Sequence, residues 1–211
     1  MAEAYIKDPA AIYRLSFERV RAATDLSRFP DDVAELVIRV VHACGMPDAA
    51  KDIAFTQNVA AKSAAALAKG APILADCAMV ASGITARFLP QNNPIVMTLY
   101  DHDIPARAQD LATTRSAAAV EDWQDHLDGA VVVIGNAPTA LFHLLEKIDQ
   151  GWAKPAAVLG FPVGFVGAAE SKAALAARDD LDYLTIHGTR GGSAMASAAV
   201  NAAAILAGRA A

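Results

Sequence analysis

From Gly70 to the end of the chain, short apolar runs alternate with segments of helical periodicity, and this alternation limits the possible folds more than any other feature. The apolar runs predict five strands, at residues 72–75, 95–99, 131–134, 157–159 and 183–187. Strands that alternate with helices form βα units, whose parallel sheet carries helices on both faces. We therefore predict an α/β fold with a flavodoxin-like, doubly wound, parallel five-stranded sheet.

Helical periodicity dominates the residues before Gly70 and fills the gaps between the predicted strands. In the N-terminal part we predict helices at residues 10–23, 31–45, 48–55 and 59–69. Further along, helices are expected at residues 76–83, 105–111, 116–127, 138–150, 168–177 and 193–206. The chain, residues 1–211, then forms a single domain, in which a helical N-terminal part, residues 1–70, extends a βα core, residues 71–211.

The predicted helix at residues 31–45 contains one residue that does not fit its pattern, His42. The apolar residues of this helix form one stripe, made of Val33, Leu36, Val37, Val40, Val41 and Cys44. At about 100° per residue, His42 falls opposite the centre of that stripe. It therefore faces either water or a second surface, such as a pocket or a partner subunit.

The apolar content and the charge exclude several classes of protein. The chain is 55% hydrophobic and 19% charged, which is enough apolar sequence to bury a core. Its net charge is −5 and it has no block of basic residues, so we expect no nucleic-acid-binding surface. An anionic ligand must then be held by a few local arginines and by helix N-termini. The uncharged run at residues 191–208 consists mostly of small residues, which predicts a buried helix and no membrane span.

The cysteines and the other histidines show no metal-ligand spacing. Cys44 and Cys77 lie in no C-x-x-C or Cys/His pattern, so we expect them to be reduced core residues. The remaining histidines are His102, His126, His143 and His187. No basic segment followed by an apolar run is visible at the N-terminus, which is typical of a cytoplasmic protein.

The segments that follow the predicted strands are the best candidates for ligand binding, because doubly wound sheets bind ligands beyond the carboxyl ends of their strands. Three of these segments, at residues 135–139, 160–167 and 188–193, are rich in glycine. Glycine lets backbone N–H groups approach a ligand, but it also serves ordinary turns and helix ends. Neither the G-x-G-x-x-G nor the G-x4-G-K-[ST] nucleotide motif occurs.

Several strings of residues are distinctive when taken together. They are I-Y-x-x-S-F at residues 12–17, D-L-S-R-F at 25–29, V-H-A-C-G at 41–45, G-A-P-I-L at 70–74, M-V-x-x-G at 79–83, T-R-S-A-A at 114–118, I-G-N-A-P-T-A-L at 134–141, P-V-G-F-V-G-A-A-E-S-K at 162–172 and G-G-S-A at 191–194. The chain, from about residue 5 to its C-terminus, resembles the precorrin-8X methylmutase family of cobalamin biosynthesis. The anaerobic counterpart of this family is cobalt-precorrin-8 methylmutase, which stays open as an alternative.

The resemblance implies an activity and an assembly. Members of the family have a flavodoxin-like fold and move a methyl group from ring carbon 11 to ring carbon 12 of a polycarboxylate tetrapyrrole. This 1,5-sigmatropic shift gives hydrogenobyrinic acid, and it uses no organic cofactor or catalytic metal. The resemblance also implies a homodimer with sites near the interface. The competing class of function is a non-catalytic carrier of a tetrapyrrole or of FMN, and the missing nucleotide motifs disfavour FMN.

The resemblance further implies which residues form the site. The histidine of V-H-x-C-G, here His42, is the proton donor and acceptor, and imidazole suits this role because it ionises near neutral pH. Ser16, in I-Y-x-x-S-F, contacts the substrate, and Arg115 matches the arginine before S-A-A. The other expected substrate-binding residues are Thr85, Asn136, Gly164, Lys172, Gly191, Gly192 and Ser193. The last family loop usually reads G-R-x-G-G-S, whereas residues 188–193 here read G-T-R-G-G-S.

Overall fold

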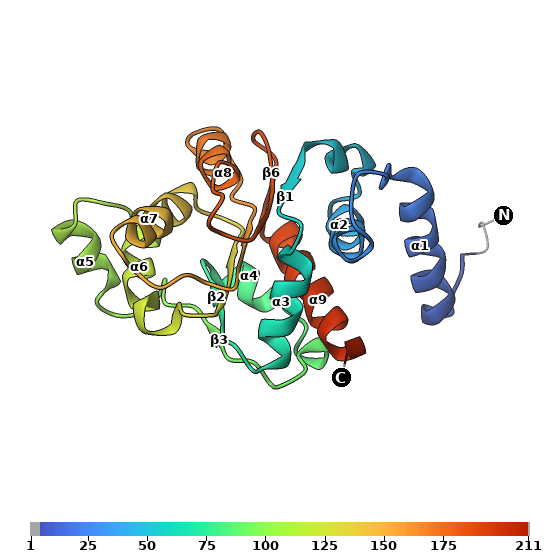
Figure 1. The fold of residues 1–211 in the computed structure, drawn as a ribbon, viewed down its shortest axis with the longest axis horizontal. Coiled ribbons are helices and arrows are strands. Elements are labelled where there is room, and N and C mark those ends of the chain that lie inside the picture. The colour runs from blue at the N-terminus through green and yellow to red at the C-terminus, as the bar shows by residue number, and fades with distance from the viewer. Residues whose placement is uncertain (1–4, 211) are drawn as a thin grey trace.

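A central sheet with helices on both faces forms the body of the protein, as Figure 1 shows for the computed structural model, which describes residues 5–210. The helices are α1 (Pro9–Ala23), α2 (Asp31–Cys44), α3 (Val59–Ala68), α4 (Ala78–Gly83), α5 (Ile104–Asp110), α6 (Arg115–Val120), α7 (Pro138–Asp149), α8 (Ala168–Ala176) and α9 (Ser193–Ala210). Short 3-10 helices are η1 (Pro47–Asp52), η2 (Ala86–Phe88) and η3 (Glu121–His126). The strands are β1 (Ile53–Phe55), β2 (Ile73–Ala75), β3 (Ile95–Val96), β4 (Val131–Ile134), β5 (Ala157–Gly160) and β6 (Tyr183–Ile186).

The sheet has six strands in the order β1-β6-β5-β4-β2-β3. The five strands from β2 to β6 pair with one another in parallel, and β1 pairs antiparallel with β6. The prediction of a five-stranded, wholly parallel sheet is therefore wrong in strand number and in the direction of one edge strand. The α/β class and the five strand positions of the βα core are confirmed.

The predicted helix at residues 48–55 is also wrong, and so is the description of residues 1–70 as purely helical. The 3-10 helix η1 occupies the first part of this segment and β1 occupies the last part. Ile53 lies opposite Ile186, and the carbonyl oxygen of Asp52 accepts a hydrogen bond from the N–H of His187 at 2.8 Å. Three residues are too few to show the period-two pattern of a strand, and their partner β6 is distant in sequence.

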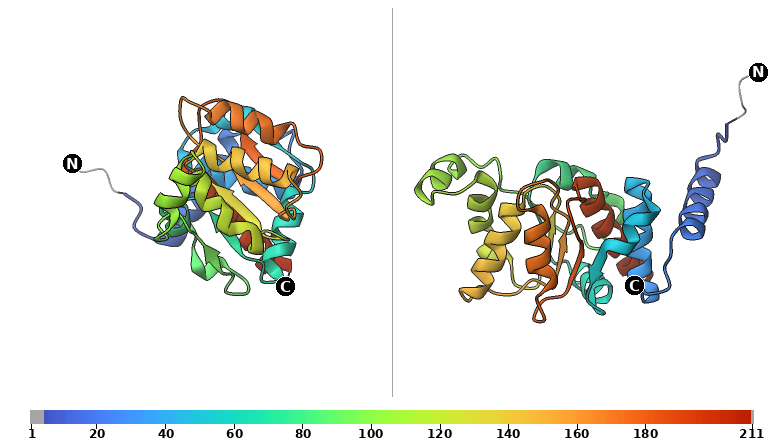
Figure 2. Two further views of the ribbon diagram at one scale, coloured as in Figure 1. Left: turned by 90° about the vertical axis from the view of Figure 1, so that its left-hand side faces the viewer. Right: turned by 90° about the horizontal axis from the view of Figure 1, so that it is seen from above.

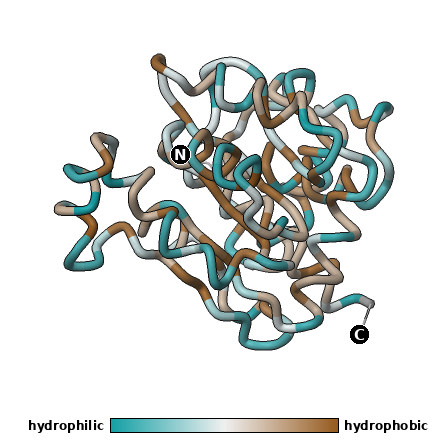
Figure 3. Tube along the Cα trace, turned by 60° about the vertical axis from the view of Figure 1, so that its left-hand side comes forward, coloured by the Kyte–Doolittle hydropathy of each residue, from teal (hydrophilic) through white to brown (hydrophobic). Residues whose placement is uncertain are grey.

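Successive side chains of each strand point to opposite faces of the sheet and belong to two apolar clusters, one on each face. Val131 and Val133 belong to the cluster shared with α2, α3, α4 and α9. Val132 and Ile134 belong to the cluster shared with η3, α7 and α8. Figure 3 shows the hydrophobic stretches concentrated along the inner strands, with hydrophilic stretches at the outer turns. This two-sided burial explains why the strands appear in the sequence as continuous apolar runs.

Several boundaries differ from the prediction by a few residues. The strand predicted at residues 95–99 shortens to β3, because the chain turns away and the hydroxyl of Thr98 donates to the carbonyl oxygen of Ala119 at 2.8 Å. The helix predicted at residues 116–127 becomes α6 followed by η3. The small-residue run forms α9, whose alanines pack closely against α2, α3 and α4.

The first helix lies at the edge of the molecule, outside α2. Figures 1 and 2 show α1 beyond α2, separated from the sheet. The Asp8 carboxylate caps it by accepting hydrogen bonds from the N–H groups of Ala10 and Ala11 at 3.1 and 3.2 Å. No residue of α1 is buried, and Ile12 and Tyr13 are 46% and 49% exposed. This helix therefore leaves an apolar surface uncovered within the single chain.

Candidate active site

His42 lies on the exposed side of α2, away from the buried stripe, which confirms the expectation from periodicity. The helix ends two residues later. Gly45 adopts the left-handed conformation (φ 70°), and its N–H donates to the carbonyl oxygen of Val41 at 2.8 Å. The Cys-Gly pair after His42 thus ends the helix and leaves the imidazole in its last turn.

Two residues of α1 hold the imidazole in place. Ser16 Oγ and His42 Nδ1 lie 3.1 Å apart, at hydrogen-bond distance. The Phe17 ring stacks on the imidazole, with centroids 4.6 Å apart and planes 22° apart. Within residues 5–210, His42 Nε2 makes no hydrogen bond, so this nitrogen is the one placed to exchange a proton with a ligand. Ser16 and His42, both expected from the sequence, are therefore in contact.

His42 lies between two hollows. The first, the α1–α2 hollow, has a volume of about 650 Å³. Its lining includes Ile12, Leu15, Ser16, Arg19, His42 and Pro47. The second, the α2–α9 hollow, has a volume of about 270 Å³. Its lining includes Arg39, His42, Ala43, Ala194, Ser197 and Asn201. The larger hollow is mainly apolar and has the size of an ordinary small-molecule site.

The junction of β4 and α7, which contains Asn136, is occupied by a carboxylate of the protein itself. Asp76, directly after β2, accepts hydrogen bonds from the N–H groups of Gly135, Asn136 and Ala137, each at 2.9 Å. Burial raises the pKa of Asp76, while these three bonds favour its charged form and limit the rise. These N–H groups are thus already used, which leaves the exposed Asn136 side chain as the part that a ligand can reach.

The other two glycine-rich loops hold each other. The N–H of Gly164 donates to the carbonyl oxygen of Thr189 at 3.2 Å, and the N–H of Gly192 donates to that of Phe161 at 2.7 Å. A Cβ at Gly191 would collide with the carbonyl oxygens of Phe161 and Pro162, so only glycine permits this approach. Gly164, Gly191 and Gly192 therefore lock the two loops together, and the N–H groups of Gly164 and Gly192 are not available to an anion.

Lys172 lies beneath these loops and is fully buried. Its ammonium donates to the carbonyl oxygen of Arg190, and burial lowers the pKa of Lys172 to about 8. The Arg190 side chain pairs with Asp48 of η1 at 2.7 Å. The ammonium, expected at the substrate, thus supports the loop from inside, and the guanidinium of the unusual G-T-R-G-G-S sequence joins the loop to η1.

The remaining expected residues lie apart from the imidazole. The N–H of Thr85 donates to Asn201 Oδ1 at 2.8 Å, which ties Thr85 to α9 near the α2–α9 hollow. Ser193, at the start of α9, lies 3.5 Å from the sulfur of buried Cys77. Arg115 is exposed at the start of α6 and lines a separate hollow with residues of α5. The chain therefore brings Ser16 to His42 but does not bring Arg115 into either hollow around His42.

Sequence reasoning missed Arg39, Ser197 and Asn201, which border the α2–α9 hollow. Arg39 stands three residues before His42, so the spacing alone could have predicted that the two side chains share one face of the helix. Ser197 and Asn201 sit within an alanine-rich helix, and nothing in the sequence says which helix that face meets. Among the described residues there is no cluster of three or more His, Cys, Asp or Glu side chains suited to a metal ion. None of the helices in residues 5–210 is long and apolar enough to cross a membrane.

Known proteins of one family are similar to this chain along nearly its whole length. The sequence model of the family described as precorrin-8X methylmutase matches residues 11–206. A precorrin-8X methylmutase from Pseudomonas aeruginosa is 56% identical over 199 residues, which cover 94% of this chain and 96% of that protein. A cobalt-precorrin-8 methylmutase from Priestia megaterium is 34% identical over 200 residues, covering 94% and 88%. The solved structure of precorrin-8X methylmutase from Thermus thermophilus matches with a TM-score of 0.88 and 37% identity, covering 95% of this chain and 97% of that one.

The three-layer fold and its matches define an α/β isomerase of the kind that shifts a methyl group within one molecule. The chain belongs to the precorrin-8X methylmutase family. Sequence and structure comparisons cover nearly the whole chain, so the family includes the α1 segment as well as the sheet.

Proposed function

We propose that this chain catalyses the 1,5-sigmatropic shift of a methyl group from carbon 11 to carbon 12 of precorrin-8X, giving hydrogenobyrinic acid, with His42 as the acid. One observation carries this proposal: an exposed imidazole lies between two hollows, with Nδ1 beside the Ser16 hydroxyl and Nε2 open to a ligand. A fixed imidazole beside an apolar hollow suits proton transfer to a large conjugated ring.

The reaction requires the protonation of the substrate ring and its later deprotonation. His42 donates a proton to the conjugated ring, which redistributes charge and lowers the barrier for the methyl group to migrate with its bonding electrons. The ring then returns the proton to the imidazole, so substrate and product have the same atoms. General acid catalysis contributes roughly 10²–10⁴ in rate. Holding the ring in one conformation supplies the remainder.

Substrate binding is expected to use residues at the surface of both hollows and at the nearby loops. Ser16 lies in contact with His42, and Thr85 and Ser193 flank α9, so these three suit carboxylate or ring contacts. Arg115 and the Asn136 side chain are exposed and suit carboxylates that extend farther. Gly164, Lys172, Gly191 and Gly192 act by shaping the loops against which the ring lies.

We propose that the protein acts as a single domain and as a homodimer with its sites near the interface. The support is α1, which has no buried residue and leaves Ile12 and Tyr13 half exposed beside the candidate site. A second copy covering this helix would bury apolar surface and close the α1–α2 hollow. Sedimentation at micromolar concentration is expected to give a dimer, and a monomer would contradict this part of the proposal.

We also propose a cytoplasmic enzyme that acts on the metal-free ring. Identity is higher to relatives named precorrin-8X methylmutase, 56% and 51%, than to the cobalt-precorrin-8 methylmutase from Priestia megaterium at 34%. The order of the parallel strands, β3-β2-β4-β5-β6, supports the flavodoxin-like description. Numbered along the chain, these strands have the order 2-1-3-4-5 of that fold.

The test is an absorbance time course of the purified protein with precorrin-8X, beside His42→Ala. We expect the wild type to convert the substrate and the variant to be slower by roughly 10²–10⁴. Conversion by His42→Ala at the wild-type rate would remove His42 as the acid. A one-to-one spectral change without turnover by the wild type would indicate a tetrapyrrole carrier and contradict the enzymatic proposal.

A further inference from the structure

Arg39 lies beside His42 and has no role in the function proposed above. It stands one turn before His42 on α2, so the two side chains lie on the same helical face. Both line the α2–α9 hollow, together with Ser197 and Asn201 of α9. A ligand that reaches His42 from this hollow therefore also meets the guanidinium of Arg39.

Arg39 has no carboxylate partner among the described residues. Glu35 stands four residues earlier on α2, the spacing at which a glutamate commonly pairs with a following basic residue. Its carboxylate instead pairs with Arg21 at 2.5 Å and with Arg209 at 3.9 Å. The positive charge beside His42 is thus left for a group from outside this part of the chain.

Aromatic rings hold the Arg39 guanidinium in one place. It lies 5.0, 5.5 and 5.8 Å from the ring centroids of Phe17, Phe88 and Tyr13, and it donates a hydrogen bond to the Tyr13 hydroxyl. The Phe17 ring also stacks on His42. One ring therefore fixes the guanidinium and the imidazole relative to each other. A guanidinium has five N–H groups, so this single bond leaves donors for a carboxylate.

We propose that Arg39 binds a carboxylate of the substrate in the α2–α9 hollow and thereby sets which ring carbons lie against His42. This inference rests on the proposed function, which supplies the polycarboxylate tetrapyrrole. A planar guanidinium and a carboxylate form a bidentate pair of defined geometry, and a fixed guanidinium loses little freedom when it binds. Arg39 therefore orients the tetrapyrrole ring, and His42 protonates it.

The test is a spectral titration of wild type and variants with hydrogenobyrinic acid, the product. We expect Arg39→Gln to raise the product Kd roughly 10–100-fold, the range for loss of a charge-assisted hydrogen bond. Arg39→Lys keeps the charge but not the bidentate geometry, so its loss of affinity should be smaller. Arg209→Gln removes the same charge from a second groove, which Arg39 and Glu35 also border but His42 does not, and its Kd should stay within about threefold of wild type.

Wild-type affinity in Arg39→Gln would overturn the inference. Equal losses in Arg39→Gln and Arg209→Gln would also overturn it, because they would reflect the overall charge of this end of the protein. If Arg39→Gln fails to fold by circular dichroism, Arg39→Lys carries the test, and wild-type affinity there together with unchanged salt dependence overturns the inference. Failure of the proposed function is seen separately, since the wild type would then leave precorrin-8X unconverted whatever the affinities of the variants for the product.

Discussion

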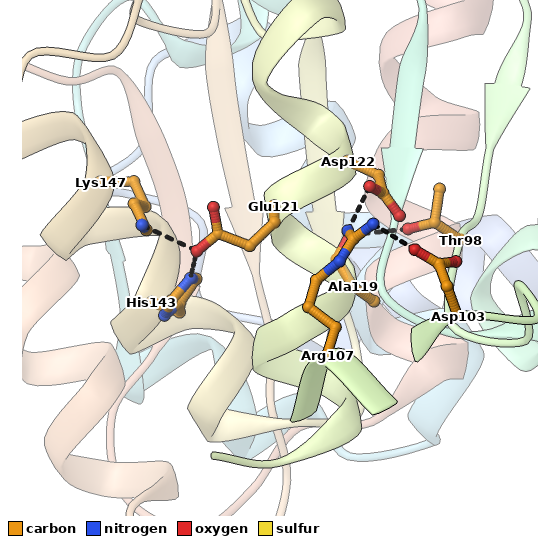
Figure 4. A network of polar contacts seen from close by, with 8 residues as sticks. All are labelled: Thr98, Asp103, Arg107, Ala119, Glu121, Asp122, His143 and Lys147. Atoms are coloured by element: carbon orange, nitrogen blue, oxygen red, sulfur yellow. Dashed lines mark hydrogen bonds and ion pairs between the residues drawn. The ribbon is translucent and has the colours of Figure 1, made fainter. Parts of the chain in front are cut away.

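Charged side chains are arranged in opposite ways at the two ends of this molecule. At the end formed by α5, η3 and α7, cations and carboxylates pair with each other (Figure 4). Arg107 pairs with Asp103 and Asp122. Glu121 pairs with both His143 and Lys147, and these two distances are 2.7 Å. At the other end, Arg39 of α2 has no carboxylate partner among the residues that the structure describes, and neither has the buried Lys172 of α8.

The difference separates side chains that stabilise the fold from side chains left for ligand binding or loop support. A carboxylate that already has an ammonium and an imidazole as partners has little to offer a ligand, and its loss affects stability. A guanidinium or ammonium without a carboxylate adds nothing comparable to stability, and when buried it is costly. The same contrast holds for two histidines: His143 is paired with Glu121, whereas His42 is held by a hydroxyl and an aromatic ring and keeps one nitrogen open.

The largest expected effect on stability concerns Lys172. Burial lowers its pKa from 10.5 to about 8. Between these pH values the unfolded chain binds this proton and the folded protein does not, so the contribution of Lys172 to stability rises with pH. From below pH 8 to about pH 10.5 we expect the unfolding free energy of wild type to gain up to about 3 kcal/mol relative to Lys172→Met. Urea titrations across this range measure the difference, and a constant difference would contradict the burial of the charge.

A substitution at each end tests the comparison directly. Glu121→Gln leaves His143 and Lys147 without their carboxylate, and we expect a loss of about 1–2 kcal/mol in unfolding free energy with unchanged turnover. Although burial raises the pKa of Glu121, its bonds to Lys147 and His143 lower it overall, so this loss should shrink as acid neutralises the wild-type carboxylate. His42→Ala is the matched control, with stability expected within about 0.5 kcal/mol of wild type. A larger loss in His42→Ala than in Glu121→Gln would reverse the roles of the two ends.

The smallest expected effect is that of Ser16→Ala. It removes the hydroxyl beside His42 Nδ1 and leaves the Phe17 stack in place. One neutral hydrogen bond is worth about 1 kcal/mol, so kcat should fall by about fivefold to tenfold. Single-turnover rates at saturating precorrin-8X measure this step without the contribution of binding. An unchanged rate would show that the Phe17 ring alone orients the imidazole.

Much of the fold follows from local patterns in the sequence. The five core strands are buried on both faces, so each appears as an apolar run between turn residues, and their positions were predicted. The short strand β1 was not, because its conformation comes from pairing with β6 and not from its own three residues. The place of His42 opposite the apolar stripe also followed from periodicity. The glycine-rich loops were recognised, but their N–H groups proved to bind neighbouring carbonyl oxygens and Asp76.

The sequence by itself determined the α/β class, the exposed side of α2 with His42 on it, and the family, because these depend on residue order over short spans. Only the tertiary structure decided which groups meet: Ser16 with His42 Nδ1, Phe17 with both Arg39 and His42, Asp76 with the turn after β4, and Lys172 with the loop carbonyl of Arg190. These contacts join elements that are distant along the chain. Their formation depends on how the helices pack and which partners remain for each charge, and no local pattern contains that information.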